Sequence, residues 1–191
     1  MRTAEITRKT AETDITVSIN LDGGACEVNT GIGFFDHMLC SFAKHGKFGL
    51  KVRVKGDLYV DGHHTVEDTG IVLGKAFLKA LGDKVGIERF ADTYIPMDES
   101  LAFCACDISG RPFLHFDAVF MQEHCGDYDT ALSEEFFRGF AMSAEVTLHL
   151  RSVYGVNAHH QTEALFKAAG RALCKAAAVT GNELPSTKGV L

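Results

Sequence analysis

Two short motifs of the same composition account for most of the chemistry that this sequence can support. Residues 63–67 read His-His-Thr-Val-Glu, and residues 159–163, 96 positions later, read His-His-Gln-Thr-Glu. If a helix begins at each histidine pair, the first histidine and the glutamate lie on one face, one turn apart, and can bind a single cation. Adjacent histidines point about a quarter-turn apart, so each pair is expected to divide between two metal ions.

We therefore predict a site with two metal ions to which both motifs contribute. The expected division assigns His63, Glu67 and His160 to one ion, and His159, Glu163 and His64 to the other. Each ion still lacks a ligand, which an upstream helix should supply. The candidates are His37 in the first half and Glu135 in the second, with His149 as a rival. Imidazole and carboxylate ligands without thiolate suit Mn²⁺, Fe²⁺ or Zn²⁺, and a nearly full shell with one open position suits octahedral Mn²⁺ best.

The repeat extends beyond the motifs, because the same shift maps Gly74 onto Gly170 and Lys79 onto Lys175. The chain is therefore expected to be one domain, residues 1–191, built from two repeats of about 1–92 and 93–191. Hydrophobic periodicity predicts strands at residues 16–21, 50–54, 102–108, 112–120 and 145–150, and helices at 32–44, 65–82, 133–144 and 162–179. This alternation is typical of an α/β or α+β sandwich.

The composition is that of an ordinary globular domain and excludes several classes of protein. The 191 residues are 46% hydrophobic and 23% charged, which rules out a disordered chain. No apolar run approaches the roughly 18–20 residues that a membrane helix needs, and the N-terminus lacks a signal peptide, so a cytoplasmic protein is expected. The net charge of −6 disfavours nucleic acid as a partner. The six cysteines are expected to be reduced, with Cys104 and Cys106 in the core.

Basic residues point to a second kind of binding. Arg89, Arg111 and Lys188 lie among glycine, proline or serine, where guanidinium and loop N–H groups can bind a phosphate. Taken singly, these three are also consistent with ordinary surface charges. Lys167 follows Glu163 by one helical turn, so its ammonium group is expected on the ligand-bearing face of that helix. A small phosphate-bearing substrate would fit this set.

With these residues in place, the sequence resembles the imidazoleglycerol-phosphate dehydratase family, enzymes of histidine biosynthesis. Matching segments run along almost the whole chain: residues 12–15, 21–23, 30–39, 45–46, 56–58, 61–68, 96–99, 107–112, 148–150, 157–160, 163–168 and 185–189. The resemblance implies an α+β fold of two duplicated βαβ-type halves, with sheets packed on helices as in the second domain of ribosomal protein S5. It also implies a homo-oligomer of 24 subunits built from trimers, with two Mn²⁺ ions per active site shared between subunits.

The family's functional residues are carried over residue by residue. The metal ligands that the resemblance implies are His37, His63, His64, Glu67, His159, His160 and Glu163. The remaining ligand, often a histidine just before a Phe-Phe pair, falls on Glu135; a carboxylate also binds Mn²⁺, but His149 stays possible. The implied substrate contacts are Glu12, His45, Arg89, Arg111, Lys167, Ser186 and Lys188, with the phosphate on the last five.

The implied reaction removes water from imidazole glycerol phosphate to give imidazole acetol phosphate. Metals on both ring nitrogens would stabilise an imidazolate, which expels the adjacent hydroxyl to form a diazafulvene with a more acidic C–H bond. Glu12 and Glu163 are the candidates for the base that removes this proton, and Glu67 is a further catalytic carboxylate. Two rivals remain: a dinuclear metallohydrolase such as a phosphatase, and a metal-storage shell, which would be almost purely helical.

Overall fold

The sheets form from segments whose side chains alternate between the core and the surface. The structure, a computed structural model, describes residues 2–191. In β2 (Thr13–Asn20), Ile15, Val17 and Ile19 are buried and the residues between them are half-buried. The strand β6 (Ser100–Asp107) alternates in the same way and buries Cys104 and Cys106, as predicted. A period of two residues turns one face of each strand toward the helices.

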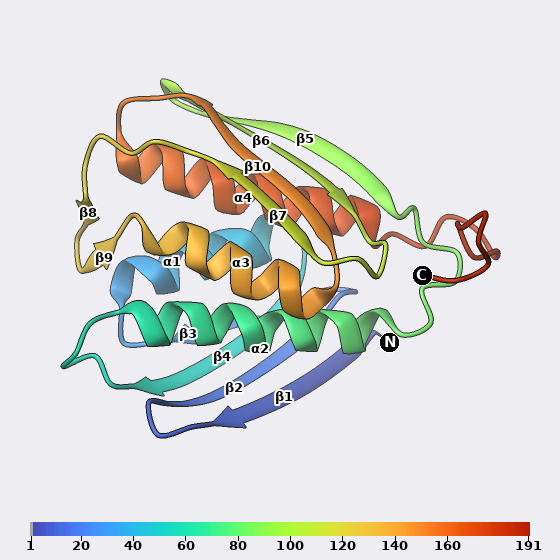
Figure 1. Ribbon diagram of the computed structural model, residues 1–191, viewed down its shortest axis with the longest axis horizontal. Coiled ribbons are helices and arrows are strands. Elements are labelled where there is room, and N and C mark those ends of the chain that lie inside the picture. The colour runs from blue at the N-terminus through green and yellow to red at the C-terminus, as the bar shows by residue number, and fades with distance from the viewer. Residues whose placement is uncertain (1) are drawn as a thin grey trace.

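Two four-stranded sheets lie on opposite sides of a layer of helices (Figure 1). The first has the order β1-β2-β4-β3, with β1 (Thr3–Lys9), β3 (Cys26–Asn29) and β4 (Gly49–Gly56). The second has the order β5-β6-β10-β7, with β5 (Phe90–Met97), β7 (Phe113–Asp117) and β10 (Thr147–Tyr154). In each sheet the last pair is parallel and the others are antiparallel. The two sheets therefore match in order and direction, as expected of a duplication.

Four helices fill the space between the sheets: α1 (Gly33–His45), α2 (His63–Leu81), α3 (Leu132–Ala144) and α4 (Ala158–Ala176). The helix α1 packs against α4, and α2 packs against α3. The ring of Phe136 lies 5.0 Å from that of Phe166 and 5.4 Å from that of Phe35, so aromatic side chains join the two helix pairs. None of the helices in residues 2–191 is both long and apolar enough to cross a membrane.

The predicted helices are all present, but several strands were missed. The helices expected at 32–44 and 133–144 are displaced by one residue at most, whereas α4 begins four residues before the expected 162. The strands β1, β3 and β5 lie at sheet edges, where one side is unpaired and burial is slight, so their hydrophobic pattern is weak. The short hairpin of β8 (His124–Cys125) and β9 (Tyr128–Asp129) was also missed.

Glycines at the helix crossings allow each pair of helices to approach closely. A Cβ atom on Gly170 of α4 would lie 2.3 Å from the carbonyl oxygen of Phe42 in α1. A Cβ atom on Gly74 of α2 would lie 2.5 Å from the carbonyl oxygen of Phe140 in α3. These two glycines are the ones that the repeat aligns. A larger residue at either position would force the two helices apart, because the added atom would meet the backbone of the facing helix and not a flexible side chain that could move.

We expect Gly170→Ala to lower the free energy of unfolding by about 1–3 kcal/mol, because the added methyl group overpacks the α1–α4 crossing. Denaturant unfolding followed by circular dichroism measures the change. Gly181→Ala is the matched control, since a Cβ atom at Gly181 meets nothing within 4 Å. Equal stability of the two variants would contradict the role of Gly170 in the helix crossing.

Candidate metal centre

Both histidine pairs lie in the first turn of a helix because a polar side chain caps the backbone just before them. The Asn157 side chain accepts hydrogen bonds from the backbone N–H groups of His159 and His160 at the start of α4. At the start of α2, the Asp61 carboxylate accepts a 2.8 Å hydrogen bond from the N–H of His63. These caps satisfy N–H groups that have no partner within the helix. The early start of α4 therefore follows from Asn157.

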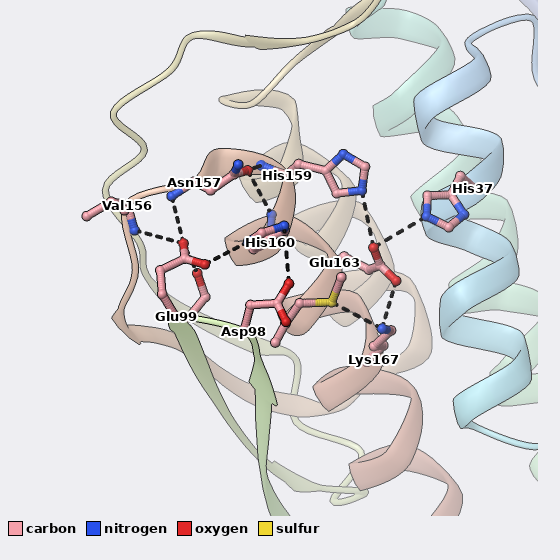
Figure 2. Close-up of polar contacts among 11 residues, drawn as sticks. His37, Asp98, Glu99, Val156, Asn157, His159, His160, Glu163 and Lys167 are labelled. Carbon is pink, nitrogen blue, oxygen red and sulfur yellow. Dashed lines mark hydrogen bonds and ion pairs between the residues drawn. The ribbon is translucent and has the colours of Figure 1, made fainter.

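The packing of α1 against α4 brings three candidate ligands together: His37, His159 and Glu163, which we call the α1–α4 cluster (Figure 2). One ligand atom of each lies within 4.8 Å of the others. The Nε2 atoms of His37 and His159 lie 3.4 and 3.2 Å from the same oxygen, Oε2 of Glu163. The two imidazoles are 50% and 46% exposed, whereas the glutamate side chain is 9% exposed. The cluster thus opens to the surface above a buried carboxylate.

The donor atoms of the α1–α4 cluster fit a divalent cation. Ligands about 2.1 Å from an octahedral cation lie about 3 Å from their neighbours, close to the N–O distances between the imidazoles and Glu163. Two imidazoles and one carboxylate are ligands that Mn²⁺, Fe²⁺ and Zn²⁺ accept.

Lys167 lies one turn beyond Glu163 and holds its second oxygen. The Nζ atom of Lys167 is 2.7 Å from Oε1 of Glu163, on the face that the helical spacing predicts. Burial alone raises the pKa of Glu163, but the hydrogen bond and charge of Lys167 outweigh it and lower the pKa overall. His45 is in the same region: burial and the positive charge of Lys167 lower its pKa. The carboxylate is therefore ionised at neutral pH, as a metal ligand must be.

The packing of α2 against α3 produces a counterpart, which we call the α2–α3 cluster: His63, Glu67 and Glu135. The Nε2 atom of His63 lies 3.5 Å from Oε2 of Glu67, which follows it by four residues, as Glu163 follows His159. His63 and Glu135 line one cavity of about 670 Å³. Glu135 also lies 3.5 Å from the guanidinium of Arg138. Glu135 occupies on α3 the position that His37 occupies on α1, but among residues 2–191 only the α1–α4 cluster brings three ligand atoms within 4.8 Å of one another.

His149, the rival of Glu135, lies elsewhere. It is exposed on β10, and its neighbours Leu148 and Leu150 point into the core, so its ring is on the outer face of the sheet. There it contacts His115 and Phe113, with ring centroids 5.5 and 5.8 Å away. The geometry therefore favours Glu135 over His149 as the ligand from the second half.

The second histidine of each motif points away from its own cluster and into a pair of carboxylates. The Nδ1 atom of His160 is 2.7 Å from Oε2 of Glu99, and its Nε2 atom is 3.6 Å from Oδ2 of Asp98 (Figure 2). The contacts of His160 in this chain are therefore with Asp98 and Glu99 and not with the expected partners His63 and Glu67. The hydrogen bond to His160 is the main cause that lowers the pKa of Glu99 to about 2.

His64 has the same arrangement in the first half. Its Nδ1 atom lies 3.0 Å from Oδ2 of Asp57, and its Nε2 atom lies 3.7 Å from Oε1 of Glu12. The hydrogen bond that His64 donates to Asp57 is the main cause that raises the pKa of His64. The sequence singled out Glu12 but missed Asp57, Asp98 and Glu99. The signal for the last two was their position in a turn between two strands, equivalent to the turn that carries Glu12.

The remaining basic candidates lie at the other end of α4. The backbone N–H of Arg89 donates to the carbonyl of Ala176, the last residue of α4, and its Nη1 donates to the carbonyl of Pro185 at 2.7 Å. Arg89 also pairs with Asp107, 2.8 Å away, and Arg111 lies 3.5 Å from the same carboxylate. Ser186 and Lys188 belong to the adjoining C-terminal segment, which is at the end of the molecule opposite β8 (Figure 1).

These basic residues are thus far from the clusters within one chain. His159 and Ala176 are separated by the length of α4, about 25 Å at about 1.5 Å per residue. Of the five predicted phosphate contacts, only Lys167 lies beside the histidines. The structure therefore divides the predicted site into a metal-binding end and a basic end.

Comparison with known proteins connects this arrangement to one family. The family model described as imidazoleglycerol-phosphate dehydratase matches residues 30–173. Imidazoleglycerol-phosphate dehydratases from Methylorubrum populi and Caldanaerobacter subterraneus subsp. tengcongensis are each 57% identical to this chain, with 100% of both proteins covered.

Solved structures agree with the sequence comparison and confirm the α+β fold of duplicated halves. The crystal structure of the dehydratase from Staphylococcus aureus has a TM-score of 0.84 and 40% identity, covering 94% of this chain and 99% of that one. The enzyme from Pyrococcus furiosus, solved in complex with (S)-C348, has a TM-score of 0.85 and 36% identity, covering 97% of this chain and 100% of that one. The chain belongs to the imidazoleglycerol-phosphate dehydratase family.

Proposed function

We propose that this chain dehydrates imidazole glycerol phosphate to imidazole acetol phosphate in histidine biosynthesis, as a cytoplasmic, Mn²⁺-dependent enzyme with two ions per active site. The observation that carries the metal dependence is the α1–α4 cluster, where two imidazoles approach one ionised carboxylate at 3.2 and 3.4 Å. His63 and Glu67 repeat the spacing of His159 and Glu163, and Glu135 lines the same cavity as His63, which supports a second ion. The substrate and the reaction are inferred from membership of the family.

The two clusters and the second histidines would hold the ions. When bound, Mn²⁺ supplies a Lewis acid that stabilises negative charge on the imidazole ring of the substrate. The residues proposed to hold it are His37, His63, His64, Glu67, Glu135, His159, His160 and Glu163. Lys167 keeps Glu163 ionised, and His45 lies close enough to Lys167 for the two to share the substrate side of the cluster.

Glu12 is the better of the two candidates for the base. Both oxygens of Glu163 are already in contact, one with Lys167 at 2.7 Å and the other with the two imidazoles, and its side chain is 9% exposed. The Glu12 side chain is 53% exposed, and its contact with His64 is long at 3.7 Å. A mobile, solvated carboxylate beside a metal-binding histidine can approach and deprotonate a substrate carbon. Glu67, 3.5 Å from His63, is proposed to act as a ligand.

The phosphate of the substrate would be bound by the basic end of another subunit. Arg89, Arg111, Ser186 and Lys188 lie about 25 Å from His159 in the same chain, farther than a small phosphate ester can reach. A second copy must therefore complete the site. This requirement supports the homo-oligomer of 24 subunits built from trimers that the family resemblance implies.

Removal of the metal is expected to abolish dehydration. The protein is treated with a chelator, its metal content is checked by elemental analysis, and the formation of imidazole acetol phosphate is followed with and without added Mn²⁺. Activity should be lost with the metal and recovered with Mn²⁺, since the substrate ring then lacks its Lewis acid. Full turnover by metal-free protein would exclude the metal proposal. Release of inorganic phosphate without the keto product would favour the metallohydrolase instead.

Glu135→Ala is expected to remove one of two bound Mn²⁺ ions per chain or to weaken its binding at least tenfold, because Glu135 lines the cavity of His63. His149→Ala should leave both ions in place, since His149 contacts His115 on the outer face of the sheet. Equilibrium dialysis with elemental analysis compares the two variants. The opposite result, with loss of metal only in His149→Ala, would transfer the ligand role to His149.

Asp57 is proposed as a positioning residue for His64. Its carboxylate accepts a hydrogen bond from Nδ1, which fixes the ring and leaves Nε2 free to bind metal. Asp57→Ala should weaken Mn²⁺ binding by about 10–100-fold, measured from the paramagnetic resonance signal of unbound Mn²⁺. Asp57→Asn should restore part of the affinity, because the amide oxygen can accept the same hydrogen bond.

Two controls separate positioning from general destabilisation. The half-buried Asp14 of strand β2, which pairs with Lys9, is the first control: Asp14→Ala should leave Mn²⁺ affinity unchanged. In a His64→Ala background, Asp57→Ala should have no further effect on the affinity, because the ring that it orients is gone. An additive loss in that double variant would show that Asp57 acts on the metal by a route other than His64.

A further inference from the structure

We propose that Cys26 and Cys40 form a reversible disulfide bond that ties strand β3 to helix α1. Cys26 is the first residue of β3, an edge strand, and Cys40 lies in the middle of α1. Their Sγ atoms are 3.2 Å apart, with the Cys26 thiol donating to Cys40. A disulfide needs about 2.05 Å, so the sulfur atoms must close by only about 1 Å. This pair is independent of the metal ligands and of the proposed function.

Solvent can reach the pair. Cys26 is exposed and Cys40 is half-buried, in contrast to Cys104 and Cys106, which are fully enclosed by the core around β6. A small oxidant can therefore reach the Cys26 sulfur from solution without unfolding of the chain. Accessible thiols in contact with each other are the arrangement in which oxidation gives a disulfide rather than two separate products.

The repeat shows that the fold itself does not need thiols at these positions. Cys26 pairs with Leu50 of β4, and at the equivalent place in the second sheet Leu148 of β10 pairs with Leu114. The same alignment, which places His37 on Glu135, places Cys40 on Arg138. The second half therefore has a leucine and an arginine where the first has two thiols. The contact between the cysteines is a specific property of the first half.

The reaction requires an oxidant, for which we name a small disulfide such as oxidised glutathione. One protein thiolate attacks it and releases one reduced glutathione; the second protein thiolate then displaces the other glutathione from the mixed disulfide. Two protein thiols are oxidised to one disulfide, the glutathione disulfide is reduced, and the two protons pass to the released thiolates. Burial and the contact with Cys40 raise the pKa of Cys26 to about 12, so closure is slow and is best measured at equilibrium.

The bond would stiffen the element that carries His37. Cys40 lies three residues after His37 on α1, so a link to β3 anchors the helix within one turn of the α1–α4 cluster. Closing a loop of this length restricts the unfolded chain, and the thermal midpoint should rise by several degrees. The link leaves the ligand atoms themselves free.

The test equilibrates the metal-loaded protein in glutathione buffers at pH 8.5, blocks remaining thiols by alkylation and maps the peptides by mass spectrometry. We expect a Cys26–Cys40 crosslink within one chain as the main oxidised product, a thermal midpoint several degrees higher, and reversal of both by dithiothreitol. Cys26→Ser and Cys40→Ser should each abolish the crosslink and the shift. Cys125→Ser, which removes another half-buried thiol, should keep both.

Two results would overturn the proposal. Recovery of Cys26 and Cys40 as alkylated thiols or as separate glutathione adducts, in buffer that is fully oxidised, would show that the pair does not close. An equal rise of the thermal midpoint in Cys26→Ser would show that the stabilisation comes from another modification. Neither result depends on dehydratase activity, so the test is separate from that of the metal centre.

Discussion

The close approach of helices in pairs is the constraint on which the candidate site depends. The α1–α4 cluster takes two residues from the start of α4 and a third from α1 packed beside it, so the distance between the helix axes sets the distance between these candidate ligands. Glycine at the crossing allows backbone to meet backbone, at Gly170 in one pair and Gly74 in the other. The glycines conserve between the two halves the spacing that a metal ion would need.

A second constraint is electrostatic. A buried carboxylate must stay ionised to bind metal, and the chain places Lys167 one turn beyond Glu163 on the same helix. The cation offsets the cost of burying the charge before any metal arrives. The second histidines of the two motifs, His64 and His160, are instead held by carboxylates, which contact their Nδ1 atoms. The Nε2 atoms of these two imidazoles face a second carboxylate each, Glu12 at 3.7 Å and Asp98 at 3.6 Å.

Periodicity and the repeat were enough to predict the four helices, the buried faces of β2 and β6, and the nearness of Lys167 to Glu163. They failed where the signal is not local. Edge strands such as β3 bury too little to show a pattern. The carboxylates around His160 come from a turn 61 residues earlier in the chain, and spacing says nothing about such contacts. The choice between Glu135 and His149 needed the helix pairing, because both follow from plausible alignments.

The duplication also bears on the proposed sharing of the site between subunits. It produces two metal-binding ends that are equivalent in position, but the basic residues have no such symmetry: Arg89 and the C-terminal segment meet at the far end of α4, about 25 Å from His159. The second histidine of each motif points away from its own cluster and toward carboxylates. The candidate metal ligands lie at one end of the chain, and the predicted phosphate-binding groups lie at the other. The two ends would therefore form one site only when they belong to different copies of the chain. This separation supports the proposed assembly of subunits, to which the binding of metal would then be coupled.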